Sequence, residues 1–119
     1  MEMLTLKSLR FLGYHGHYKH EREEGNDFEV DLVFTGELRA AGESDELSDT
    51  IDYQQAQEIA RSVMEGPSVK LIETLAKRIG DRIFEAIPQA QSLEVTVRKL
   101  QPPLDIETAY SEIRMQWQR

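Results

Sequence analysis

Three histidines lie close together near the start of the chain, in a pattern that could bind a metal ion. His15, His17 and His20 all fall within GYHGHYKHEREEG, residues 13–25. Histidine is the commonest metal ligand, but zinc sites usually take their ligands from more than one segment. His20 also lies in the charged run KHEREE, which is typical of a solvated loop. We therefore predict a polar loop without bound metal, with at most one histidine in contact with a substrate.

Lys99 is a second candidate for chemistry, because it ends a strand-like segment on the apolar side. In SLEVTVRK, residues 92–99, Val95 and Val97 have the same parity as Lys99 and alternate with polar residues. A lysine that faces an apolar layer is costly unless it is paired or used. It could also simply emerge where the strand leaves the core, and the pattern alone leaves both interpretations open.

Two segments in the first third of the chain predict a wide β-hairpin. MLTLKSLRFLGY, residues 3–14, is typical of a strand with a bulge near Ser8. DFEVDLVFTGEL, residues 27–38, alternates more regularly, with Phe28 on the apolar face and Asp31 on the polar one.

The period then changes to that of helices. A first helix is predicted over residues 53–63 with Asp52 as its N-cap, and a second over residues 72–83 with Ser68 as its cap. Two strands follow, over 92–99 and 110–117. The fold class is therefore α+β, in the order β-β-α-α-β-β: a four-stranded antiparallel sheet with two helices on one face. Because such a sheet has open edges, we expect several sheets to join into an oligomeric barrel, with sites between subunits.

Length and composition limit the classes of function. The 119 residues suit one domain, 1–119, and the net charge of −8 argues against a nucleic-acid partner. The absence of cysteine excludes disulfides and thiolate chemistry. No apolar run suits a signal peptide or a membrane span, so we expect a cytoplasmic protein without membrane contact.

An ordered set of motifs covers nearly all of the sequence. LKSLRFLGYHG is followed by Glu21, FEVDL, DTIDY, MEG, LIETLAKRI and VRKLQPP, from about residue 4 to residue 117. This set resembles the dihydroneopterin aldolase family of folate biosynthesis. The resemblance implies the tunnelling fold and a homo-octamer of two stacked four-membered rings. It also implies retro-aldol cleavage of a pterin substrate without cofactor, metal or Schiff base.

The resemblance also implies roles for individual residues. Glu73, with the backbone of Ile72, would anchor the pterin, because a carboxylate can accept two adjacent N–H donors in a fork. Lys99, Tyr53 and Glu21 match catalytic positions, and Tyr53 and Glu21 also match substrate-binding positions. Otherwise Glu73 and Glu21 are ordinary surface charges, and Tyr53 is an aromatic residue packed at a helix start.

One motif departs from the family, and three other functions stay open. Many members resemble PP-(I/M)-x-G after the lysine, whereas this chain has PPLDIETAYS, with Asp105 and Glu107 added and no glycine.

On the same fold, the alternative is a dihydroneopterin triphosphate epimerase. A non-catalytic pterin-binding module is a third candidate, and a zinc-dependent synthase resembling the pyruvoyltetrahydropterin synthases is a fourth. Those synthases resemble one another in having a further histidine on the first strand, whereas residues 1–14 of this chain contain none.

Overall fold

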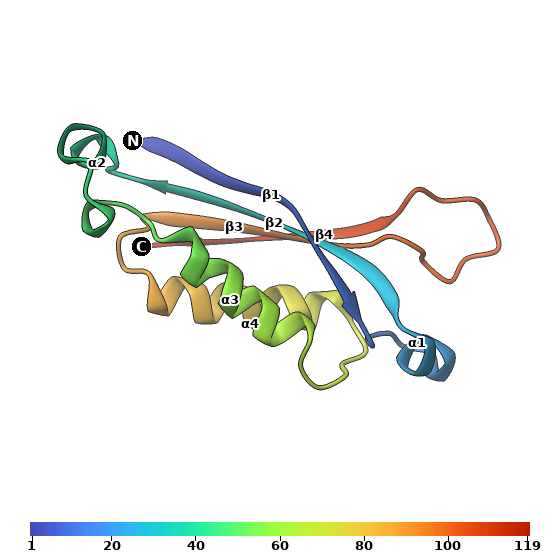
Figure 1. The fold of residues 1–119 in the computed structure, drawn as a ribbon. Coiled ribbons are helices and arrows are strands. Elements are labelled where there is room, and N and C mark those ends of the chain that lie inside the picture. Colours follow the sequence, from blue (N-terminus) through green and yellow to red (C-terminus); the bar gives the residue numbers. More distant parts are fainter.

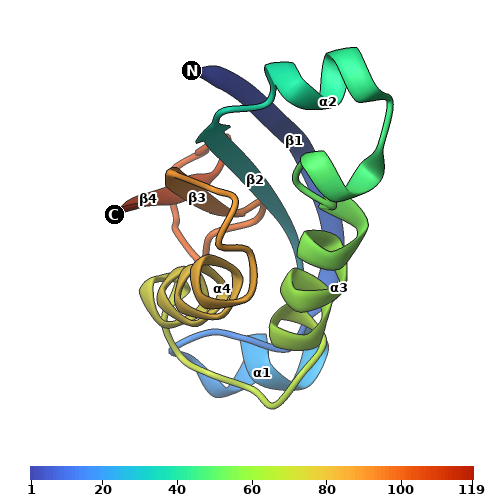
Figure 2. The same cartoon turned by 90° about the vertical axis from the view of Figure 1, so that its left-hand side faces the viewer.

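The computed structural model describes residues 1–119. A four-stranded antiparallel sheet forms one layer, and the two long helices α3 and α4 cover one of its faces (Figures 1 and 2). The elements in sequence order are β1 (Glu2–Gly13), α1 (Lys19–Glu24), β2 (Asn26–Gly36), α2 (Arg39–Ser44), the 3-10 helix η1 (Leu47–Asp49), α3 (Tyr53–Met64), α4 (Ile72–Ala86), β3 (Ser92–Lys99) and β4 (Ser111–Gln118). The predicted β-β-α-α-β-β order is confirmed, and the short helices α1, α2 and η1 are additions that were not predicted.

The strands lie in the order β1-β2-β3-β4, so β1 and β4 are the outer strands. The predicted apolar face of β2 is confirmed, because Phe28 and Val30 are fully buried against the helices. The predicted bulge in β1 is also present, as a register shift between Leu6 and Leu9. Ser8 occupies the bulge with a φ of 57°, and its N–H donates to Asp31 Oδ1 at 2.8 Å.

One of the two predicted helix caps is confirmed and the other is wrong. Asp52 precedes α3, and its carboxylate accepts a hydrogen bond from the N–H of Gln54 at 3.1 Å. Leu71 precedes α4 without a side-chain cap, and the Ser68 hydroxyl donates instead to the carbonyl of Tyr14. Ser68 is therefore used to join two segments that are distant in sequence. None of the helices combines the length and the apolar character needed to cross a membrane.

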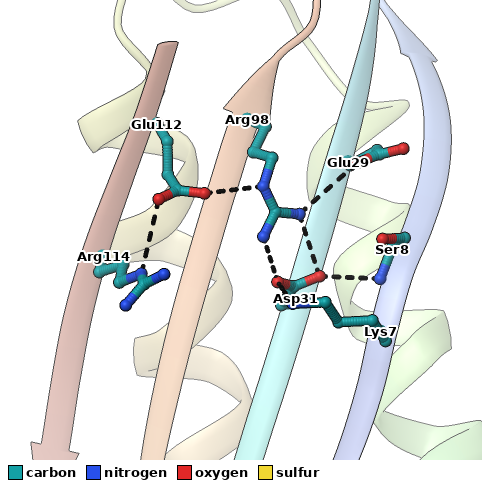
Figure 3. Close-up of polar contacts among 7 residues, drawn as sticks. All are labelled: Lys7, Ser8, Glu29, Asp31, Arg98, Glu112 and Arg114. Atoms are coloured by element: carbon teal, nitrogen blue, oxygen red, sulfur yellow. Dashed lines mark hydrogen bonds and ion pairs between the residues drawn. The ribbon is translucent and has the colours of Figure 1, made fainter. Parts of the chain in front are cut away.

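The sheet face opposite the helices carries a buried ionic network (Figure 3). Asp31 and Arg98 were predicted to point outward, and they do point away from the helices, yet they are only 5% and 7% exposed. Arg98 donates with both terminal nitrogens to Asp31 and with Nε to Glu112 at 2.7 Å, and Lys7 Nζ lies 3.0 Å from Asp31. Burial alone would raise the pKa of Asp31, but Arg98, the Ser8 N–H and Lys7 outweigh it and hold that pKa far below its ordinary value.

Candidate active site

Lys99 and Glu21 form a buried ion pair at one end of the sheet. Lys99 ends β3 opposite Phe28 of β2, and its Nζ donates to Glu21 Oε1 at 2.7 Å. Both residues are buried, at 8% and 5% exposed. The prediction that Lys99 points with the apolar row is therefore confirmed. The prediction of a solvated charged run is wrong for Glu21, because α1 turns this one side chain inward.

Short-range contacts hold the Glu21 carboxylate in place. The backbone N–H of Tyr18 donates to Glu21 Oε2 at 3.1 Å. Gly16 lies directly against the carboxylate, and a Cβ at this position would be 2.5 Å from Glu21 Cδ. Burial by itself would raise the pKa of Glu21, but the hydrogen bonds from Lys99 and Tyr18 outweigh it and hold that pKa below its ordinary value. Glu21 is therefore a carboxylate at neutral pH, paired with an ammonium group.

A polar cleft of about 200 Å³ opens beside this ion pair. Most of its lining residues are polar, and they are His20, Glu21, Glu24, Gly25, Asn26, Gln101 and Pro103. The segment leaving β3 is held here, because Asn26 Nδ2 donates to the carbonyl of Gln101 at 2.8 Å. The added acids of the following loop, Asp105 and Glu107, are exposed. The cleft can therefore admit water and small polar groups to the ion pair.

Helix α4 begins at Ile72 and Glu73. Its start lies at the same end of the fold as α1, which carries Glu21 (Figure 1). Ile72 is half-buried and packs against the core, whereas Glu73 is exposed. No hydrogen bond or ion pair engages the Glu73 carboxylate within the chain. The Glu73 carboxylate is thus free to accept hydrogen bonds from a ligand.

Tyr53 lies at the opposite end of the helix layer. It begins α3, is 53% exposed, and lines a hollow of about 350 Å³ together with Leu4 and Ile51. Met64 lies eleven positions further along α3, which corresponds to about 16 Å along the helix axis. Met64 in turn contacts His15, near the ion pair. A single protomer therefore brings Lys99, Glu21 and the start of α4 to one end and leaves Tyr53 at the other.

The three histidines do not converge. His15 is 1% exposed and points into the core, where its ring nitrogens face the carbonyl of Met64 and the N–H of Val69. His17 and His20 are exposed, and no group of three or more His, Cys, Asp or Glu side chains is placed to hold a metal ion. The predicted solvent exposure is thus right for His17 and His20 and wrong for His15, and His20 lies in the helix α1 and not in a loop. The only signal in the sequence was the pair of glycines, since Gly13 leaves room for the His15 ring.

The family model and the curated relatives point to one family, and solved structures at lower identity share its fold. Residues 4–116 match the family model described as dihydroneopterin aldolase. A dihydroneopterin aldolase from Streptococcus pyogenes is 38% identical over 104 residues, which are 87% of each chain. Among solved structures, a Vibrio cholerae protein assigned to the dihydroneopterin aldolases superposes with a TM-score of 0.90 at 22% identity, over 100% of this chain and 98% of that one. E. coli dihydroneopterin aldolase in complex with neopterin has a TM-score of 0.88 at 19% identity, over 98% and 99% of the two chains.

Proposed function

The chain belongs to the dihydroneopterin aldolase family, and on this premise we propose that it cleaves 7,8-dihydroneopterin into 6-hydroxymethyl-7,8-dihydropterin and glycolaldehyde. Residues 1–119 then form one aldolase domain, a carbon–carbon lyase. The observation that carries the proposal is the buried Lys99–Glu21 pair, which lies at the same end of the fold as the unpaired carboxylate of Glu73. In this proposal Glu73 anchors the pterin ring and Lys99 transfers protons, and these two residues are held by the helix α4 and the strand β3.

Glu73 anchors the pterin in this proposal. The ring edge presents two adjacent N–H donors, and an unpaired carboxylate can accept both in a fork. The backbone of Ile72, the first residue of α4, supplies a second contact to the same edge. The E. coli relative of the same fold was solved in complex with neopterin, which supports a pterin as the ligand class.

Lys99 and Tyr53 handle the proton transfers of the cleavage, and Glu21 contacts the tail of the substrate. The carbon–carbon bond in that tail breaks, its electron pair enters the adjacent ring C=N bond to form an enamine, and the hydroxyl proton passes to a water molecule beside Tyr53 as glycolaldehyde forms. Lys99 then gives a proton to the carbon that stays on the ring, and the proton taken up by water restores the charge of Lys99. Lys99 donates to Glu21 at 2.7 Å, and an ammonium group held this way is a proton donor and not a nucleophile. This supports cleavage without a Schiff base, and the ring C=N bond already supplies the electron sink for which a metal would otherwise be needed.

Tyr53 reaches the reaction only if a second subunit supplies it. Within one protomer it lies about 16 Å from the end of α3 that adjoins His15. The outer strands β1 and β4 each have one unpaired edge, which suits ring closure by neighbouring sheets. We therefore propose sites at subunit boundaries in a homo-octamer of two stacked four-membered rings. A cytoplasmic location is part of the same proposal.

The test is an assay of glycolaldehyde release from 7,8-dihydroneopterin in the presence of a chelator and, separately, of borohydride. We expect full turnover with chelator and no covalent trapping of substrate by borohydride. Lys99→Ala should lower kcat by about a hundredfold to ten-thousandfold, and Glu73→Gln should mainly raise KM. Lys77→Ala, on the exposed face of α4, is the matched control. Turnover that requires metal, or a trapped adduct on Lys99, would overturn the mechanism.

An epimerase that acts on dihydroneopterin triphosphate is the nearest alternative. The cleft beside Lys99 carries the carboxylates of Glu21 and Glu24, which repel a triphosphate. We therefore expect faster turnover of the unphosphorylated substrate when both are assayed side by side. Faster turnover of the triphosphate would favour the epimerase, and tight neopterin binding without any turnover would favour a binding module.

A further inference from the structure

The end of β1 is joined to the connection between α3 and α4 by four hydrogen bonds. Residues 14–16 and residues 64–69 lie side by side, although about 50 positions separate them. The four bonds run from the Ser68 hydroxyl to the Tyr14 carbonyl, from the Gly16 N–H to the Val69 carbonyl at 2.9 Å, from the Val69 N–H to His15 Nδ1 at 3.1 Å, and from His15 Nε2 to the Met64 carbonyl at 2.7 Å. His15 makes two of the four, so it is the centre of this connection.

The partners of His15 define its tautomer. Because the Val69 N–H donates to Nδ1, that nitrogen carries a lone pair, and Nε2 carries the hydrogen that it donates to Met64. Burial, together with the charge of Lys99, outweighs the Met64 carbonyl and holds the pKa of His15 below its ordinary value. The ring also packs edge-on against Phe28, with centroids 5.6 Å apart. His15 is thus a neutral, rigid bridge with both nitrogens in use.

The two joined segments lead directly to the two halves of the proposed site. Gly16 is followed by α1, which carries Glu21, and Glu21 holds Lys99. Val69 is followed by α4, which begins at Ile72 and carries Glu73. A pterin ring is rigid, so the spacing between its anchor and the proton-transfer pair must match the ligand closely. A misplacement of about 1 Å can cost roughly a hundredfold in rate.

We propose that His15 is a positioning residue: it sets the spacing between the Lys99–Glu21 pair and the start of α4 by joining β1 to the α3–α4 connection. This inference rests on the proposed aldolase function. His15 is 1% exposed and its ring nitrogens are occupied, so it acts through these segments and does not touch the substrate.

The test compares two substitutions of His15 that keep its bulk. His15→Phe keeps an aromatic ring against Phe28 but removes both hydrogen bonds. His15→Gln offers an amide, whose N–H and oxygen can replace the donor and the acceptor. We expect His15→Phe to lower kcat/KM about 10-fold to 100-fold, and to raise KM and the dissociation constant of neopterin several-fold. His15→Gln should recover most of that loss, and His17→Phe, at an exposed position, should match the wild type.

The outcomes test the positioning role of His15 separately from the proposed aldolase activity. If the wild type cleaves the substrate while folded His15→Phe keeps wild-type KM, kcat and neopterin affinity, the positioning role is wrong and the aldolase stands. Failure of His15→Gln to improve on His15→Phe would also overturn it. If His15→Phe does not fold, His15→Asn takes its place, because the shorter amide keeps an acceptor near the Val69 N–H but does not reach the Met64 carbonyl. A several-fold rise in KM of the folded variant supports the proposal, and an unchanged KM refutes it.

Discussion

Replacing Lys99 with methionine tests the energetics of the buried ion pair. The substitution keeps a long side chain but leaves the Glu21 carboxylate, 5% exposed, without its ammonium partner. Removal of one partner of a buried pair typically costs about 3–5 kcal/mol. We expect about 3 kcal/mol at pH 7, the lower end of that range. The reason is that the adjacent cleft admits water, and the Tyr18 N–H still contacts Glu21.

The double substitution Lys99→Met with Glu21→Gln separates an unpaired charge from lost packing. Without a buried charge, we expect the double variant to recover to within about 1 kcal/mol of the wild type. The measurement is the free energy of unfolding from urea titrations at one protein concentration, because the oligomer makes stability depend on concentration. Lys19→Met is the matched control. Its partner Glu23 lies 3.6 Å away on the exposed side of α1, so the loss should stay below about 0.5 kcal/mol.

The stabilisation from the pair should depend on pH with a defined sign. The pKa of Glu21 is held below its ordinary value, so the stabilisation is fully present above that ordinary value and is lost as the pH falls through the folded pKa. In Lys99→Met, burial without the Lys99 partner raises the pKa of Glu21, so the difference between wild type and variant should begin to shrink above the ordinary pKa of a glutamate and continue to shrink as the pH falls through the lowered wild-type pKa. A loss below about 0.5 kcal/mol at pH 7, or a double variant as unstable as the single one, would refute the reasoning.

Contacts elsewhere in the fold lead to three more expected outcomes. Asp31→Asn should lower the free energy of unfolding by about 3 kcal/mol, measured by urea titration, because it leaves the Arg98 guanidinium buried with a weaker partner. The low pKa of Asp31 also predicts that wild-type stability falls on acidification below about pH 5 and that Asp31→Asn flattens this dependence; equal slopes in the two proteins would contradict it. Gly80→Ala should lower Tm, at a cost of about 1–3 kcal/mol, because its Cβ would overlap the Trp117 ring, and Trp117→Phe in the same protein should restore part of the loss.

The sequence pattern predicted strand faces and helix caps correctly where these depend on residues close together in the sequence. The alternation of residues 27–38 correctly assigned Phe28 to the buried face, because side chains on a strand alternate whatever the partner strand is. Asp52 was correctly predicted as an N-cap, since the N–H from which it accepts lies two residues away. Ser68 has the same capping chemistry but bonds to Tyr14, 54 positions away, and that competition is not visible in a local pattern.

Periodicity along the chain is enough to place the main strands and helices in order and to assign their buried faces, and the ordered motifs indicate the family that the family model matches. Which polar groups are buried, and with which partners, depends on the folded molecule. Glu21 meets Lys99 across 78 positions, and Asp31 meets Arg98 across 67. The physical reason is that periodicity encodes which face a side chain takes, whereas its partner depends on the strand register and helix packing of the whole molecule.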